Sequence, residues 1–297
     1  MYDVIIIGGG VAGLAASIYA QRFEMKTLVL SEFFGGTVTK THLIENYPGF
    51  SSISGFELAQ KLVDHAKSVS AEMKSEKVDS IEKNPEGFTV KTSVETYETR
   101  TVILATGTHH RKLNVPGETE FANKGVSYCA TCDGPFFRDK TVAVVGGSDS
   151  AVKESLLLAK YAKHVYIIYR KKEVRPEPIN KQRMTAEPKI EVIAESNVVE
   201  ILGDQTLKKV KLDTGKELEL DGLFIEIGRL PQTELAKSLG VEMNEKNEIK
   251  IGRMSETNIP GFYAAGDVTD SDWKQAIVGV AEGVKAAYNA YNFATGN

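Results

Sequence analysis

The pattern of strand, glycine turn and helix occurs twice in this chain, and that repeat constrains the fold more than any other feature. The first copy starts at Asp3 and reads DVIIIGGGVAGLAA; the second starts at Thr141, about 138 residues later, and reads TVAVVGGSDSAVKE. A second apolar run follows each copy, at residues 27–30 and 164–168, as in a strand–helix–strand unit. Such units build parallel sheets covered by helices. The sequence therefore predicts an α/β protein with two doubly wound, Rossmann-like nucleotide-binding domains.

Length and charge limit the remaining possibilities. The 297 residues suffice for two domains of about 150 residues each. A formal net charge of −4 gives no broad basic field, so we expect no nucleic-acid partner. The most apolar stretch, residues 4–20, lacks a positively charged start and contains three successive glycines, so it fits neither a signal peptide nor a membrane span. The sequence predicts a cytoplasmic protein without a membrane segment.

The first glycine turn has the spacing Gly8-x-Gly10-x-x-Gly13, directly after a strand and at the start of a helix. The first glycine permits the turn, the second lets a pyrophosphate approach the backbone, and the third lets helix and strand pack closely. Glu32 stands 19 residues after Gly13, where an acid is expected to bind a ribose hydroxyl. The turn predicts a bound dinucleotide. A glycine-rich turn of some other α/β protein is the alternative.

The second glycine turn has the spacing Gly146-x-Ser148-x-x-Ala151, and it also contains Gly147 and Ser150. Serine stands where the second glycine usually stands. Its side chain reduces how closely a phosphate approaches the backbone but does not prevent the approach. We therefore expect a second dinucleotide at this turn.

A basic cluster follows the second turn at the distance where an NAD-binding fold has an acid. Arg170, Lys171 and Arg175 belong to this cluster. Positive charge at this place fits the 2′-phosphate of NADPH, so the cluster predicts NADPH rather than NADH. A solvated basic turn is the alternative.

Only two cysteines occur, Cys129 and Cys132, in the spacing C-x-x-C. Two cysteines cannot form a four-cysteine zinc site, and only the adjacent histidines His109 and His110 lie anywhere near them, so we expect no metal centre. A disulfide across so short a loop adds little stability. In a chain built of strand–helix–strand units, a redox-active pair is the remaining use.

Further patterns indicate how the chain is divided. Strands are indicated at residues 87–92, 101–105, 223–227 and 261–264, and a terminal helix at 273–294. Linker-like stretches lie at residues 112–117 and 237–247, where the apolar pattern is interrupted.

The segment CATCDG at residues 129–134 resembles the redox motif of the thioredoxin reductases, in which an aspartate follows the cysteine pair. Further stretches agree with that family in order and spacing along nearly the whole chain. They are GG at residues 35–36, ENYPGF at 45–50, ATG at 105–107 and AAGDV at 264–268. The chain is thus similar to the low-molecular-weight thioredoxin reductases, which belong to class II of the FAD- and NAD(P)-dependent pyridine nucleotide-disulfide oxidoreductases.

The resemblance implies an FAD-binding domain at residues 1–113 and 243–297, with an NADPH-binding domain, residues 114–242, inserted into it. Asp267 would lie at the ribityl or phosphate end of FAD. The last helix would start beside the isoalloxazine, where a helix N-terminus stabilises the negative charge of a reduced flavin. The positions implied for FAD are Gly8, Gly10, Gly13, Glu32, Gly36, Asn46, Thr106, Gly107, Gly266, Asp267, Gln275 and Ala276. Those implied for NADPH are Gly146, Gly147, Ser148, Ser150, Ala151, Arg170, Lys171 and Arg175.

Two of these assignments have alternatives. Asn46 could instead be a turn-forming asparagine before Tyr47 and Pro48. Asp133 would be the acid that holds a proton near the thiolate, but aspartate is also a common helix cap.

The activity that the resemblance implies is that of a thioredoxin-disulfide reductase. Electrons pass from NADPH through FAD to the Cys129–Cys132 pair and then to the disulfide of thioredoxin. In that family pattern Cys132 faces the flavin and Cys129 attacks the partner disulfide. The resemblance also implies a homodimer.

Three rival interpretations remain. The same cysteine pair could serve another disulfide substrate, although a peroxidase partner would normally demand an extra N-terminal redox domain. Another reductant such as ferredoxin could feed the flavin, because Ser148 and Tyr169 depart from the family pattern; Arg170, Lys171 and Arg175 argue against it. A nucleotide-sensing module without enzymatic activity is disfavoured by the intact cysteine pair.

Overall fold

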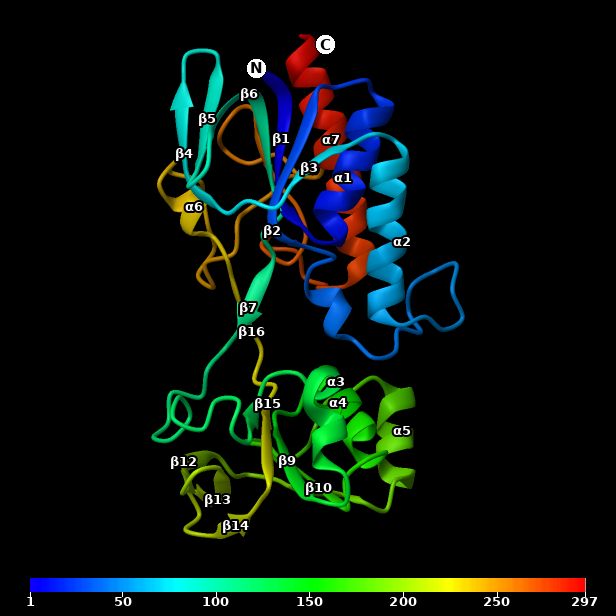
Figure 1. Ribbon diagram of the computed structural model, residues 1–297, viewed down its shortest axis with the longest axis vertical. Helices are drawn as coiled ribbons and strands as arrows, with labels where there is room; N and C mark the ends of the chain where they lie inside the picture. The colour runs from blue at the N-terminus through cyan, green and yellow to red at the C-terminus, as the bar shows by residue number, and fades with distance from the viewer. Residues whose placement is uncertain (297) are drawn as a thin grey trace. The chain divides into compact units, whose positions relative to one another are not determined.

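The computed structural model describes residues 1–296 and divides into two compact units (Figure 1). Unit 1 combines Met1–His109 with the chain from Pro231 on, and unit 2 is His110–Leu230, so the second unit is inserted into the first. The sequence analysis placed the two crossings at residues 113/114 and 242/243. The chain instead crosses at 109/110 and 230/231. It passes through β7 (Thr108–His110) and β16 (Arg229–Pro231), which pair as a two-stranded sheet.

Unit 1 is built on a seven-stranded sheet of order β3-β2-β1-β6-β5-β4, with β17 also paired to β6. The strands β1, β2, β3, β6 and β17 run parallel, whereas β4, β5 and β6 are joined as an antiparallel meander. The bounds are β1 Tyr2–Gly9, β2 Thr27–Phe34, β3 Glu72–Lys74, β4 Val78–Asn84, β5 Gly87–Thr92, β6 Thr96–Leu104 and β17 Phe262–Ala264. Parallel strands bring their carboxyl ends to one edge, where ligands bind in such sheets.

Helices cover one face of this sheet (Figure 1). They are α1 (Val11–Arg22), α2 (Gly55–Ser68) and α7 (Ala276–Thr295), with a short 3₁₀ turn, η1 (Thr37–Lys40), before α2. Alternation along β1 explains the layering: Val4 and Ile6 pack toward α1 and α7, while Ile5 and Ile7 face a second core. The helices α1 and α7 approach so closely that a Cβ on Gly283 would lie 2.1 Å from the carbonyl oxygen of Ala12.

The chain between residues 231 and 242, which the sequence analysis gave to the second domain, packs in unit 1. It contains α6 (Glu234–Lys237). Ala236 and Val241 are buried in the same core as Ile5 and Ile7. Burial of these apolar side chains therefore sets the domain division at a point earlier than the linker-like composition suggested.

Unit 2 is built on a five-stranded parallel sheet of order β11-β10-β9-β15-β8. The bounds are β8 Val126–Ser127, β9 Thr141–Val145, β10 His164–Ile168, β11 Ile190–Ile193 and β15 Gly222–Ile225. On one face lie the helices α3 (Ala130–Asp133), α4 (Asp149–Ala159) and α5 (Pro178–Ala186), with the 3₁₀ turn η2 (Gly134–Phe137). The other face carries an antiparallel sheet of β12 (Val198–Gly203), β13 (Leu207–Leu212) and β14 (Glu217–Glu219).

The expected secondary structure is confirmed, with small shifts at the ends. The runs expected at residues 87–92, 101–105, 223–227 and 261–264 contain or overlap β5, β6, β15 and β17. The terminal helix starts at Ala276 rather than at residue 273, because Gln275 has an extended backbone, with φ −132° and ψ 150°. Within residues 1–296 no helix combines the length and the apolar character that crossing a membrane requires.

Candidate functional site

The first glycine turn connects the end of β1 to the start of α1 and leaves no room for side chains at two of its glycines. Gly8 has φ +118°, and a Cβ there would lie 2.2 Å from the carbonyl oxygen of Ala105 at the end of β6. A Cβ on Gly13 would lie 1.9 Å from the carbonyl oxygen of Gly8. These contacts hold the helix N-terminus against the strand end.

Gly10 and Gly36 form an open backbone cradle beside this turn. Gly10 is the N-cap of α1, and the one atom within 4 Å of a Cβ built on it is the Cα of Gly36, at 3.8 Å. In the reverse direction, a Cβ on Gly36 would come within 2.6 Å of the Cα of Gly10. The exposed N–H groups of a helix N-terminus without side chains nearby suit a pyrophosphate. The cradle therefore fits the dinucleotide expected here.

Thr106 and Gly107 follow β6 and are fixed by Gln232. The Thr106 hydroxyl donates to the carbonyl oxygen of Gln232 at 2.7 Å, and the Gln232 amide donates to the carbonyl oxygen of Thr106 at 2.7 Å. The backbone N–H of Gln232 also bonds the carbonyl oxygen of Gly107 at 3.0 Å. The segment expected to contact the flavin is thus bound to a chain stretch far away in sequence.

Gly266 follows β17, directly before Asp267, and is held by a buried acid of α7, Glu282. One carboxylate oxygen, Oε2, accepts the N–H of Gly266 at 2.7 Å and lies 3.2 Å from the hydroxyl of Thr269. Gly266 has φ +82°, and a Cβ there would lie 3.1 Å from that of Ala12 in α1. The Gly266 turn therefore lies beside α1, at the same edge of the sheet as the first glycine turn.

The start of α7 brings together two residues that are far apart in the sequence. The amide of Asn46 donates to Oε1 of Gln275 at 3.1 Å, and Gln275 directly precedes Ala276, the first residue of the helix. The bond places Asn46, one of the positions implied for FAD, beside the residue that precedes the last helix. Glu32 lies within β2 rather than in a turn after it, and it is exposed.

The second glycine turn connects β9 to α4 in unit 2. Gly146 has φ +147°, and a Cβ there would lie 2.2 Å from the carbonyl oxygen of Glu226 and 3.0 Å from the Cβ of Ala151. A Cβ on Gly147 would lie 2.5 Å from the ring of Tyr169, which is buried. Tyr169 thus packs against the turn, which accounts for an aromatic residue at this position.

Backbone contacts bring Arg175 to Ser148. The N–H of Arg175 bonds the carbonyl oxygen of Gly147 at 2.7 Å, and Ser148 and Arg175 form an isolated parallel bridge. Ser148 is the N-cap of α4, so the backbone of a basic residue lies next to the N–H groups that would bind a phosphate. Ser150 lies in the first turn of α4, and Arg170 and Lys171, which follow β10, are exposed.

Asp149 holds the segment that carries Arg175, and the sequence analysis missed it. One of its oxygens accepts the N–H of Glu177 at 2.9 Å and the amide of Asn180 at 2.8 Å, and the other pairs with Lys153 at 2.9 Å. Although burial opposes ionisation, the hydrogen bonds from Lys153 and Asn180 keep the pKa of Asp149 below its usual value.

The two cysteines form a disulfide across the short helix α3. Their Cα atoms are 5.3 Å apart, and the N–H of Cys132 points at Sγ of Cys129 at 3.2 Å. Cys129 is buried at 8% exposure, whereas Cys132 is exposed. The structure thus confirms that the C-x-x-C spacing pairs within itself, while the separate roles of the two sulfurs stay a prediction.

The carboxylate of Asp133 lies beside the same segment and does not act as a helix cap. It accepts the hydroxyl of Ser127 at 2.6 Å, and the oxygen of that hydroxyl accepts the N–H of Cys129 at 3.0 Å. Asp133 is formally the N-cap of η2 but makes no capping hydrogen bond there. The cap alternative is therefore not what the fold uses.

A second acid, Glu154 of α4, also contacts the cysteine segment. The N–H of Ala130, between the cysteines, points at Oε1 of Glu154 at 3.4 Å. The other oxygen, Oε2, is buried and has no hydrogen-bond partner among the described residues. Burial, and then the negative charge of Glu226, raise the pKa of Glu154 to about 8, opposed by the Ala130 N–H and Arg229.

Glu118 connects the first residues of unit 2 with Tyr128, the residue before Cys129. Its carboxylate accepts the N–H groups of Leu113 and Asn114 at 2.9 and 2.6 Å and the hydroxyl of Tyr128 at 2.6 Å. Burial, and then the hydrogen bond to Glu118, raise the pKa of Tyr128. The ring of His110 packs 5.8 Å from that of Tyr128, and its Nδ1 lies 3.6 Å from Glu226.

Sequence reasoning missed five positioning residues: Glu118, Asp149, Glu154, Gln232 and Glu282. Each is polar and occurs in a helix or loop, where polar residues usually mark a solvated face. Glu282 gave the clearest signal, because it is the one acid in the apolar run from residue 276 to 284.

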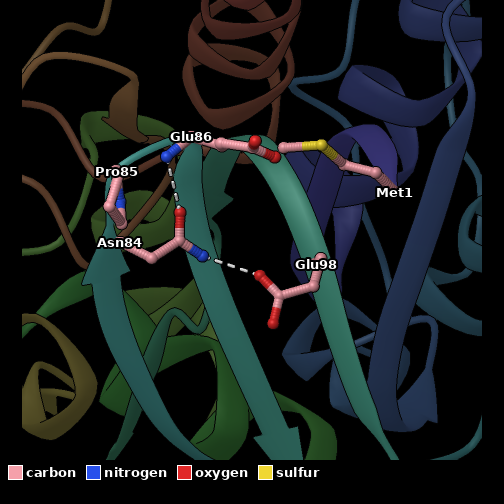
Figure 2. Close-up of a pocket in the computed structure, with 5 residues that line it drawn as sticks. All are labelled: Met1, Asn84, Pro85, Glu86 and Glu98. Atoms are coloured by element: carbon pink, nitrogen blue, oxygen red, sulfur yellow. Dashed lines mark hydrogen bonds between the residues drawn. The ribbon is translucent and has the colours of Figure 1, made fainter.

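Two surface pockets lie away from these residues. Figure 2 shows the first, at the turn between β4 and β5, where Asn84 bonds both the N–H of Glu86 and the carboxylate of Glu98. It is also lined by Met1 and Pro85. The second is lined by Met243, Asn244, Glu245, Lys246 and Lys250. No residue expected to bind a cofactor lines either pocket.

Comparison with known proteins places the whole chain in one group. The family model described as pyridine nucleotide-disulphide oxidoreductase matches residues 2–283. A thioredoxin reductase of Listeria innocua is 39% identical over 99% of this chain and 94% of its own length. The crystal structure of Lactococcus lactis thioredoxin reductase covers all of both chains with TM-score 0.97 and 39% identity. That of T. acidophilum thioredoxin reductase covers 98% of each chain with TM-score 0.93 and 38% identity.

Proposed function

The chain belongs to the pyridine nucleotide-disulphide oxidoreductase family, and from that premise we propose that it is an NADPH-dependent thioredoxin-disulfide reductase that carries FAD. The observation that supports this best is the Cys129–Cys132 disulfide in the same unit as the second glycine turn. A pair closed over so short a loop serves exchange rather than stability.

In this proposal unit 1 holds FAD. The cradle of Gly8, Gly10, Gly13 and Gly36 receives the pyrophosphate, and Asp267 binds the ribityl or phosphate end. The N-terminus of α7 is fixed by the bond between Asn46 and Gln275, and it would stabilise negative charge on the flavin. When bound, the two cofactors supply hydride and electron transfer.

Unit 2 holds NADPH and the cysteine pair. Arg175 beside Ser148, together with Arg170 and Lys171, supplies the charge that would bind a 2′-phosphate. Once the pair is reduced, the Cys129 thiolate attacks one sulfur of the thioredoxin disulfide, and the other thioredoxin sulfur leaves. Cys132 then attacks the mixed disulfide, re-forming the bond to Cys129 and releasing the dithiol. Asp133 would hold and return the protons of these steps.

Three further features belong to the same proposal. Thioredoxin is the protein substrate, by similarity to the relatives above. The enzyme acts as a homodimer, which size measurement in solution tests. A cytoplasmic location is likewise a prediction, which cell fractionation tests.

The first test is an anaerobic titration of the purified protein with NADPH and, separately, with NADH, followed by the flavin absorbance. Bleaching by NADPH at far lower concentration than by NADH supports the proposed electron donor. Bleaching by neither would reject NADPH and favour a protein reductant such as ferredoxin. Turnover is then measured with NADPH and thioredoxin; a Cys132→Ser variant that still turns over would reject the role of the pair.

A further inference from the structure

The disulfide of unit 2 has two acids near it, and the proposed mechanism uses one. Asp133 is bound to Ser127. The second acid, Glu154, contacts the backbone between the cysteines, with Oε1 at 3.4 Å from the Ala130 nitrogen. A carboxylate that is buried next to a redox pair has to respond to the charge that the pair acquires.

We propose that Glu154 is a proton-holding residue of the redox pair, taking up one proton when the Cys129–Cys132 disulfide is reduced and releasing it when the disulfide re-forms. This inference rests on the proposed function only for the source of the electrons. It concerns the cysteine pair of unit 2, whichever donor reduces it.

The charge balance of reduction favours such a response wherever Glu154 is ionised. Two electrons break the S–S bond, one sulfur takes a proton to become a thiol, and the other remains a thiolate. The new negative charge raises the cost of ionising any carboxyl group nearby. An ionised Glu154 therefore takes a proton from solvent as the thiolate forms, so that one negative charge replaces another.

The surroundings of Glu154 favour this exchange. Its Oε2 is buried without a hydrogen-bond partner among residues 1–296, so the charged form gains little from its site. The negative charge of Glu226 raises the pKa of Glu154 further, and the positive charge of Arg229 lowers it. His110 lies on the far side of Glu226, with Nδ1 at 3.6 Å from that carboxylate. The other acid of the cysteine segment, Asp133, accepts the Ser127 hydroxyl.

The pKa of Glu154 sets where the effect is visible. With the disulfide intact it is about 8, so near neutral pH the group is mostly protonated and above this pH it is mostly ionised. Proton uptake on reduction is therefore expected above pH 8. By reciprocity, an ionised Glu154 disfavours the thiolate by the same factor, so the two groups titrate as a coupled pair.

The test measures the equilibrium between the disulfide and a dithiothreitol redox buffer in the holoenzyme at several values between pH 7 and 10. The measured quantity is the apparent equilibrium constant for reduction of the disulfide. We expect its decrease between pH 7 and pH 10 to be about fivefold larger in the wild-type protein than in Glu154→Gln. The matched control is Glu219→Gln, which removes an exposed acid of the same unit and should retain the wild-type slope. Equal slopes in wild type and Glu154→Gln would overturn the proposal.

A second variant covers the case in which Glu154→Gln fails to fold. Glu226→Gln removes the negative charge that raises the pKa of Glu154, so the additional pH dependence should persist and move to lower pH. An unmoved profile would contradict the proposal. Alkylation of the reduced protein by iodoacetamide provides an independent readout, with two pH steps expected in wild type and one in Glu154→Gln. Failure of dithiothreitol to reduce the pair at all would instead contradict the proposed function.

Discussion

The two glycine turns share a pattern but differ in how each would bind the phosphates of the proposed nucleotides. In unit 1 the turn offers backbone groups alone. A Cβ on Gly13 would lie 1.9 Å from the carbonyl oxygen of Gly8, and Gly10 faces open space beside Gly36. In unit 2 an alanine, Ala151, occupies the third position without obstruction. There the fold adds cationic side chains around the turn. We therefore expect nucleotide binding at the first turn to depend on the shape of the backbone, and at the second turn to depend on positive charge as well.

The largest effect that this comparison predicts is for Gly13→Ala. The added methyl group overlaps the Gly8 carbonyl oxygen, so helix and strand separate, with a loss of about 3 kcal/mol or more in the free energy of unfolding. We also expect the purified variant to lack flavin, measured as the ratio of flavin to protein absorbance. The matched change in unit 2, Ala151→Gly, should cost at most about 1 kcal/mol. Equal losses in the two variants would break the comparison.

The next effect concerns charge at the second turn. Arg175→Gln should raise KM for NADPH by about 10- to 100-fold, because a charged hydrogen bond to phosphate contributes about 1.5–3 kcal/mol. KM for NADH should change little. Lys172→Gln, an exposed neighbour in the same stretch, provides the control. An equal rise in KM for NADPH and NADH would show that Arg175 stabilises the turn rather than binding the 2′-phosphate.

A third prediction tests Glu282, the buried acid that holds Gly266 in the segment proposed to bind flavin. Glu282→Leu leaves the N–H of Gly266 without its acceptor, and we expect flavin affinity to fall by about tenfold, as for a buried donor left unpaired. Glu282→Gln keeps one oxygen able to accept from both Gly266 and Thr269 and should bind flavin almost as the wild type does. Flavin release followed by fluorescence measures both. Weak binding in the glutamine variant would mean that the negative charge matters.

A fourth prediction concerns the pH dependence of stability due to Glu154. Its pKa rises from 4.5 to about 8 on folding, so between these values the folded state holds a proton that the unfolded state has lost. Stability from this group is therefore present below about pH 4.5 and declines as the pH rises toward 8. Urea unfolding of wild type and Glu154→Gln across this range should show the decline in the wild type alone. Parallel curves would contradict it.

The sequence predicts those parts of the molecule that depend on local rules. Glycines are required where φ is positive or a Cβ has no room, and alternating apolar runs mark strands, so the two turns and their sheets could be anticipated. The cysteine pair followed from the count and spacing alone. In each of these cases the residue type itself carries the information.

The rest depends on contacts between distant segments. Glu154 is an acid in a helix, and nothing in its neighbourhood in the sequence distinguishes a buried acceptor from a solvated charge. For Glu282 the one signal was the apolar run around it. Gln232 acts on Thr106 across 126 positions. The second domain crossing was misplaced for the same reason, because the charged stretch after residue 237 conceals Val241, which is buried in the core of unit 1.

The interruption of unit 1 by unit 2 also has a consequence for synthesis on the ribosome. Residues 110–230 form a continuous compact unit and can fold as soon as they have emerged. Unit 1 must wait, since β17 and α7 follow unit 2 in the chain and α7 packs tightly on α1. Until then, the apolar faces of β1 and α1 are not buried against α7. A chaperone would therefore be most useful while the first segment of unit 1 waits for the second.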